Sequence, residues 1–184
     1  MKKSIVIFAL FLIGFTNVNA QLLQFGLKGG VNFSNYSGGD IEGFDFNNVT
    51  NFHFGVVTEL KFFENFALQP ELLYSTQGSE LESLEEQIKN ELGYISIPVL
   101  AKFYLTSNKL SLEGGPQFSF LVNERGDVDV YDSNTFDFGV AAGLSYKITK
   151  GLFLSGRYVA GLTDVKKEAD VKNSLVQFSL GYMF

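Results

Sequence analysis

Apolar and polar residues alternate along most of the chain after residue 20. In the segment 24–33, for example, Phe25 and Leu27 fall on one face, and Gln24 and Lys28 fall on the other. A period of two is typical of a β-strand whose two faces meet different surroundings. The segments with this period are Gln24–Phe33, Phe52–Phe62, Phe66–Gln77, Tyr94–Leu105, Leu110–Val122, Phe136–Ile148, Leu152–Leu162 and Ser174–Phe184. The pattern therefore predicts eight strands.

The connections between these segments alternate in length. Short turns are expected at 63–65, 106–109 and 149–151, and long polar loops at 34–51, 78–93, 123–135 and 163–173. Short turns at one end and long loops at the other are typical of outer-membrane barrels, whose turns face the periplasm. We expect an all-β fold, an eight-stranded antiparallel up-and-down transmembrane β-barrel with both chain ends on the periplasmic side.

The two faces of the predicted strands differ in a way that favours lipid outside. The apolar faces are rich in Phe and carry almost no charge, whereas the polar faces carry Gly, Ser and charges of both signs. Small and charged side chains suit a narrow lumen. A soluble lipocalin-like carrier has the reverse arrangement, with apolar side chains around an internal ligand cavity, and it is the alternative fold for eight such strands.

The first twenty residues form a separate unit. Lys2 and Lys3 precede the apolar run 5–15, and Val18-Asn19-Ala20 offers a cleavage site, which predicts a signal peptide at 1–20 and a barrel domain at 21–184. The run is too short to cross about 30 Å of hydrocarbon as a helix. The chain contains no Cys, so neither a lipid-modified N-terminus nor a disulfide is expected.

The net charge and the pattern of the C-terminal residues limit the kinds of partner that the protein is expected to bind. The net charge of −6 becomes about −8 once Lys2 and Lys3 are removed, which disfavours nucleic acid because phosphates require a basic surface. Residues 178–184 alternate and end in Phe184, like the last strand that outer-membrane proteins present to the barrel-assembly machinery. We expect the bacterial outer membrane as the location, with its lipid and that machinery as partners.

Several short motifs resemble one known family. They are the opening segment 25–34, the segment Tyr94-Ile95-Ser96-Ile97-Pro98-Val99-Leu100, Gly114-Gly115-Pro116-Gln117-Phe118 and the segment 157–163. The whole mature chain resembles the outer-membrane β-barrel domain that is common in Bacteroidetes and includes the PorT-like proteins. The resemblance implies a barrel but no particular activity.

The prolines and paired glycines lie inside the predicted strands. Gly29-Gly30 and Gly114-Gly115 are expected to relieve crowding where strands curve around a small barrel. Pro70, Pro98 and Pro116 cannot donate to a ladder, so each is expected at a bulge or near a rim.

Charged residues on the polar faces are the main candidate site. Arg157 is the only arginine inside a predicted strand, and carboxylates on other strands could face it across the lumen. Because buried charges need partners, we expect a structural network of ion pairs formed by Glu59, Glu71, Lys102, Glu113 and Arg157. A proton path or a small binding site is the functional alternative. No catalytic residue, metal site or cofactor is expected.

His53 is the only histidine, so a small outer-membrane enzyme acting on lipid or peptide through a serine–histidine mechanism would have to use it. That hypothesis requires a serine and a carboxylate close to His53 in the folded protein. Activity that survives His53→Ala would exclude it.

The long loops carry most of the acidity. Asp127, Asp129 and Asp132 could hold a divalent cation, but a complete calcium-loop spacing is missing. Apolar residues at helical spacing, with a capping pair at Ser79 and Glu82, predict a short helix at 79–92. We expect a non-enzymatic membrane anchor or interaction platform whose loops bind a protein or glycan.

Overall fold

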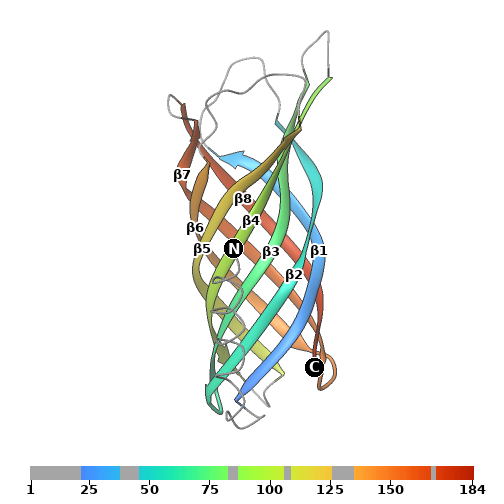
Figure 1. Ribbon diagram of the computed structural model, residues 1–184, viewed down its shortest axis with the longest axis vertical. Helices are drawn as coiled ribbons and strands as arrows, with labels where there is room; N and C mark the ends of the chain where they lie inside the picture. The colour runs from blue at the N-terminus through green and yellow to red at the C-terminus, as the bar shows by residue number, and fades with distance from the viewer. Residues whose placement is uncertain (1–21, 38–45, 83–86, 106–108, 126–134, 167–168) are drawn as a thin grey trace, which may run out of the picture.

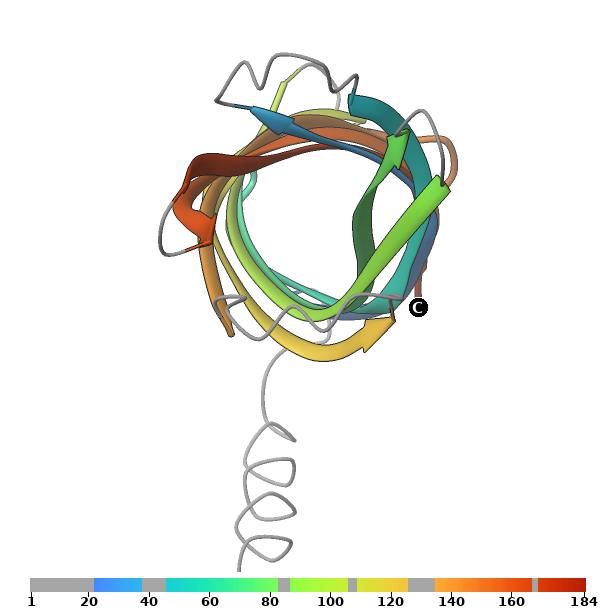
Figure 2. The ribbon, with the colours of Figure 1, turned by 90° about the horizontal axis from the view of Figure 1, so that it is seen from above.

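The computed structural model describes residues 22–37, 46–82, 87–105, 109–125, 135–166 and 169–184. Its eight strands form one closed antiparallel barrel, in which consecutive strands pair and β8 pairs with β1 (Figures 1 and 2). The strands are β1 (Leu23–Ser37), β2 (Phe46–Phe63), β3 (Phe66–Glu82), β4 (Gln87–Tyr104), β5 (Leu110–Arg125), β6 (Phe136–Lys147), β7 (Leu152–Lys166) and β8 (Ala169–Met183). The predicted eight-stranded up-and-down barrel is confirmed. The expected signal peptide at 1–20 lies outside the described residues.

The short turns lie at one end of the barrel, together with the start of β1 and the C-terminus (Figure 1). Several strands extend further toward the opposite end than the alternation predicts. β3 continues to Glu82 and β4 begins at Gln87, and their pairing includes Ser79 with Asn90 and Leu81 with Ile88. The predicted helix at 79–92 is therefore wrong, because cross-strand pairing overrides the local helical spacing.

Apolar side chains cover the outside of the barrel, and polar side chains fill its interior. Phe54 and Phe178 point outward and are 56% and 54% exposed, whereas Lys102 and Arg157 point inward and are 2% and 3% exposed. A soluble carrier would reverse these faces, so the lipocalin-like alternative is excluded. Among the described residues, no helix combines the length and apolar character needed to cross a membrane.

Aromatic side chains gather toward both ends of the strands. Phe66 and Phe103 lie 5.0 Å apart between ring centroids near the short-turn end, and Phe120 and Phe136 lie 5.4 Å apart toward the other end. Such bands mark the two interfaces of an outer-membrane barrel.

The prolines interrupt the backbone ladder without shifting it. Pro70 pairs with Val99 of β4. On the other side of β3, the ladder with β2 has the pair of Val57 with Glu71 and then the pair of Leu60 with Leu68, and the two pairs expected between them are missing. Similar two-pair gaps follow at Pro98, between β3 and β4, and at Pro116, between β4 and β5. We call these three adjoining gaps the proline seam.

The expectation that each proline occupies a bulge or rim is therefore wrong. The register continues unchanged across every gap of the proline seam, and each proline lies at least four residues inside its strand. The physical reason is that a strand residue directs its N–H toward only one of its two neighbouring strands, so a proline removes pairing on that side alone. The strand keeps its pairing on the other side, as Pro98 does with Gln117 and Pro116 with Val140.

The glycine pairs divide between the two faces. Gly30 and Gly115 face the lumen at close approaches, where an added Cβ would overlap the carbonyl oxygen of Phe178 or of Val99. Gly29 and Gly114 face outward, where an added Cβ would meet its nearest neighbour at 3.5 Å, an ordinary contact. Only the inward member of each pair relieves crowding.

Candidate functional site: a polar network across the lumen

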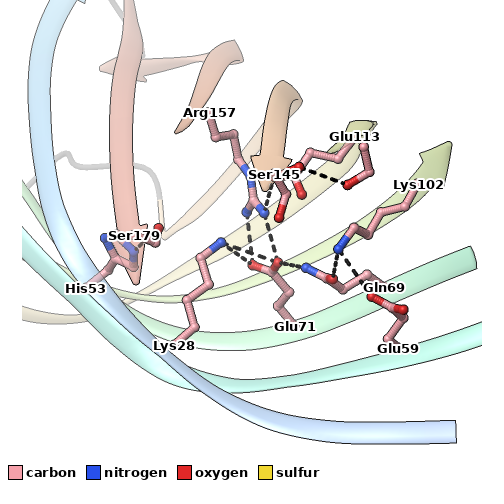
Figure 3. A network of polar contacts seen from close by, with 11 residues as sticks. Lys28, His53, Glu59, Gln69, Glu71, Lys102, Glu113, Ser145, Arg157 and Ser179 are labelled. Carbon is pink, nitrogen blue, oxygen red and sulfur yellow. Dashed lines mark hydrogen bonds and ion pairs between the residues drawn. The ribbon is translucent and has the colours of Figure 1, made fainter. Parts of the chain in front are cut away.

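All five residues predicted for the lumen network lie inside the barrel and are buried. Alternation along the strands places them there, because every second side chain points inward. They form two connected clusters, one around Arg157 and one around Glu59 (Figure 3).

Arg157 of β7 holds two carboxylates. Its Nη1 and Nη2 donate to the two oxygens of Glu71, on β3, at 2.9 and 2.8 Å. Its Nε and Nη2 also donate to Oε1 of Glu113, on β5, at 3.0 and 2.8 Å. Lys28 of β1 adds an ion pair to Glu71 at 3.3 Å. Two cations thus face two anions, and contacts from four strands meet across the lumen (Figure 3).

Glu59 of β2 is the centre of the second cluster, nearer the short turns. Its carboxylate accepts from Lys102 at 3.2 Å, from Lys147 at 3.1 Å and from the Tyr104 hydroxyl at 2.6 Å. From the sequence, Glu59 is one of the carboxylates that could face Arg157; in the structure it pairs with these lysines.

Gln69 joins the two clusters. Its Nε2 donates to Glu71 at 2.6 Å, and its Oε1 accepts from Lys102 at 2.8 Å. Glu59 and Gln69 stand opposite each other at the gap between β2 and β3, and Lys102 of β4 bonds to both, so side-chain bonds connect these strands where that part of the backbone ladder is missing. The interior is therefore a cross-linked polar core.

A third group of hydrogen bonds surrounds His53. The Asn32 Nδ2 is taken by acceptors, namely Ser75 Oγ at 2.9 Å and the carbonyl oxygens of Thr76 and Phe52. The Asn32 Oδ1 therefore accepts from the His53 Nδ1–H at 2.6 Å, which leaves Nε2 to accept from the Ser179 hydroxyl at 2.8 Å. This order of serine, histidine and amide matches the hydrogen bonds of a nucleophile, its base and the group that orients the base.

The hydrolase hypothesis requires a serine and a carboxylate beside His53, and the structure provides only the serine. A serine lies beside His53, but the third member is the amide of Asn32 rather than a carboxylate. All three side chains are buried inside the barrel wall, with Ser179 6% exposed and His53 1% exposed. A substrate acyl group must come within about 3 Å of the nucleophile. Ser179 lines an apolar hollow of about 510 Å³ in the barrel wall, but the buried His53 does not line it.

Sequence reasoning missed the contacts of Lys28, Gln69, Tyr104 and Lys147 with the predicted five. Each was an inward position by alternation, but nothing in one strand tells which other strand it meets. Asp127, Asp129 and Asp132, which could hold a cation but lack a complete calcium-loop spacing, lie outside the described residues. Within the described part of the chain, no group of three or more His, Cys, Asp or Glu could hold a metal ion.

Comparison with known proteins agrees with this architecture. The family model of the outer membrane protein beta-barrel domain matches residues 19–167. The chain belongs to this family. The protein is thus a bacterial outer-membrane β-barrel, with its short turns toward the periplasm and its opposite end toward the outside of the cell.

Solved outer-membrane barrels have the same fold at low identity. Neisserial surface protein A matches with a TM-score of 0.57 at 15% identity, covering 88% of this chain and 97% of that one. The outer membrane protein OprG from Pseudomonas aeruginosa matches at 0.54 and 12% identity, covering 88% and 95%. Ail, the attachment invasion locus protein of Yersinia pestis, matches at 0.52 and 16% identity, covering 88% and 97%. Comparison with curated protein sequences finds no match.

Proposed function

We propose that this barrel is a non-enzymatic membrane anchor that acts as an interaction platform through its extracellular loops. The observation that carries the proposal is the cross-linked polar core, in which Arg157 bridges β7 to β3 and β5. A lumen closed by buried ion pairs leaves the extracellular end as the surface on which a soluble partner can act.

Strand length supports the same role. A tilted strand needs about 9 to 11 residues to cross a bilayer, whereas β2 and β4 each have 18. Because the extra length lies mainly toward the long-loop end, the barrel raises its extracellular connections above the lipid surface on paired strands.

The charge of the loops restricts the partner. The loop segments expected from the sequence at 34–51, 78–93 and 123–135 each carry a net negative charge. The Ail structure holds a heparin analogue, sucrose octasulfate. A polyanion of that kind would be repelled here, so we propose a basic protein or an uncharged glycan as the partner.

The motifs at 94–100 and 114–118 further favour membership of the PorT-like Bacteroidetes proteins within the family. This affiliation rests on those motifs.

The test is complementation of a strain that lacks the protein. One variant replaces 80–89 by Asn-Gly, which joins the paired residues Ser79 and Asn90 and keeps the register of β3 and β4. A second variant carries Ser179→Ala. We expect both to fold, as judged by heat-modifiable gel mobility.

The two variants separate the platform from an enzyme. If the loops act, the shortened hairpin fails to restore surface adhesion and envelope impermeability to a hydrophobic dye, while Ser179→Ala restores both. The reverse result would favour a hydrolase that uses Ser179, His53 and Asn32. Covalent labelling of the wild-type barrel by a fluorophosphonate, lost in Ser179→Ala, would also contradict the proposal.

A further inference from the structure

The apolar hollow of about 510 Å³ crosses the outer face of the barrel wall from β5 to β8 and continues onto β1. Two rows of outward residues form its sides, and within each row the residues of neighbouring strands pair in the backbone ladder. One row has Gly156 between Leu144 and Phe178. The other row, two residues nearer the short turns, has Gly29 beside Leu180. We call this hollow the glycine groove.

The glycine groove opens toward the membrane. Leu144 and Phe178 at its sides are exposed, and the outward side chains of an outer-membrane barrel face lipid. Its floor is formed by the backbone between the two rows, because the floor residues direct their own side chains into the lumen, where they are buried. These residues include Ser145, Ser155 and Ser179.

Each glycine leaves a gap in a row of large side chains. An added Cβ at Gly156 would lie 3.5 Å from the Phe178 ring, and one at Gly29 would also meet its nearest neighbour at 3.5 Å, so neither position is crowded. On β2 and β3, by contrast, the rings of Phe54 and Tyr74 lie 5.6 Å apart and cover the wall. Atoms that border an empty gap lose dispersion contacts, so the groove favours an occupant that fills it.

The glycine groove runs from the periplasmic interface toward the middle of the barrel wall. At one end, Leu110 is the first residue of β5 and Tyr146 is one residue from the end of β6, and both lie beside short turns. At the other end, Gly29 and Val31 lie in the middle of β1. A tyrosine at the interface is typical of the level of lipid headgroups. An acyl chain with its headgroup at the periplasmic surface follows the same course.

The width and chemistry of the groove fit a single hydrocarbon chain. Its two rows are two residues apart along each strand, which is about 7 Å. None of the described residues that line it is charged. We propose that the glycine groove binds one unbranched acyl chain of a phospholipid from the periplasmic leaflet.

Native mass spectrometry of the purified full-length mature barrel tests this proposal. The delipidated protein in detergent receives equal amounts of dioleoylphosphatidylglycerol and diphytanoylphosphatidylglycerol. The two lipids share a headgroup, but the phytanoyl chains carry methyl branches along their length. We expect the wild type to retain one molecule of the unbranched lipid in excess over the branched one, because the branches do not fit between the two rows.

Three glycine variants locate the bound chain. Gly156→Leu and Gly29→Leu each fill the groove from one of its rows, and both should lose the bound lipid. Gly114→Leu is the matched control, because Gly114 also faces outward with its nearest neighbour 3.5 Å from an added Cβ but does not line the groove. It should retain the lipid like the wild type. Heat-modifiable mobility confirms that each variant is folded.

Three outcomes would overturn the proposal. Equal retention of the branched and unbranched lipids by the wild type does so without any variant, even where a leucine variant fails to fold. An equal loss of lipid in Gly114→Leu would indicate a general effect of bulk on the outer face. A lipid-free dimer of the wild type that Gly156→Leu converts to a monomer would assign the groove to a second copy of the chain.

Discussion

Arg157 shows how the interior of this barrel depends on single side chains. It is buried and donates to two carboxylates from separate strands, so both depend on it for charge balance. Lys28 also pairs with Glu71, whereas no cation other than Arg157 pairs with Glu113 among the described residues. Replacing a well-paired ion is more costly than its net contribution suggests, because the partner remains buried and unpaired.

We therefore expect Arg157→Leu to lower the free energy of unfolding by about 3 to 5 kcal/mol. Urea unfolding in detergent micelles measures this change. Because the chain contains no Trp, unfolding is followed by circular dichroism and gel mobility. Lys150→Ala, in an exposed turn, is the control and should change stability by less than about 0.5 kcal/mol. Equal stability of the wild type and Arg157→Leu would mean that the ion pairs are not formed in the folded barrel.

The glycine pair of β1 offers a matched comparison at adjacent positions. An added Cβ at Gly30 would overlap the backbone of β8, whereas at Gly29 it would stay at ordinary contact distance. We expect Gly30→Ala to destabilise the barrel by about 1 to 3 kcal/mol through overpacking. Gly29→Ala should be close to neutral in the same urea titration, and a larger loss in Gly29→Ala would contradict the assigned faces.

At the scale of elements, the wall from β2 to β5 contains the proline seam and therefore has fewer backbone pairs than the opposite wall. Three successive junctions from β2 to β5 lack ladder pairs, whereas β5–β6 and β1–β8 pair continuously over their contact. Side-chain bonds from Lys102 to Glu59 and Gln69 cross the β2–β3 part of the seam inside the lumen.

Backbone amides beside the proline seam should therefore exchange with solvent deuterons faster than amides at the same depth in β6 and β8. Hydrogen exchange of the micelle-bound barrel, resolved by residue, measures the difference. Lys102→Met should accelerate exchange further beside the seam and leave β8 unchanged. Uniform exchange around the barrel would show that the missing ladder pairs do not weaken this wall.

The strands themselves could be predicted from the sequence, because the two faces of each strand meet opposite surroundings, lipid outside and polar side chains inside. The helical spacing at 79–92 predicts the wrong element because a local pattern carries no information on pairing with another strand. The proline gaps also needed the register, since the sequence cannot tell which neighbour faces the missing N–H.

The partners inside the lumen could be predicted only as a set. Arg157 and Glu71 are 86 positions apart, and they meet because strand tilt and stagger bring β7 and β3 to one level across a narrow barrel. The same geometry brings Glu59 into contact with Lys102 and Ser179 into contact with His53, and no sequence pattern predicts either pair.

At the scale of the whole molecule, the two clusters act as successive barriers along the lumen. The Arg157 cluster spans it in the middle, and the Glu59 cluster lies between that layer and the periplasm. An eight-stranded barrel leaves an interior about wide enough for its own side chains, so these layers fill the lumen instead of lining a channel. An ion would have to displace buried ion pairs in both layers to pass.

We therefore expect no steady conductance when the folded barrel is inserted into a planar lipid bilayer. Arg157→Ala, if inserted in the folded state, should remain silent as well, because the pairs of Glu59 with Lys102 and Lys147 still close the periplasmic part. Current recordings on preparations whose gel mobility shows complete folding measure both. Regular channel openings in the wild type would show that the lumen network opens, and the extracellular end would then no longer be the only surface left for function.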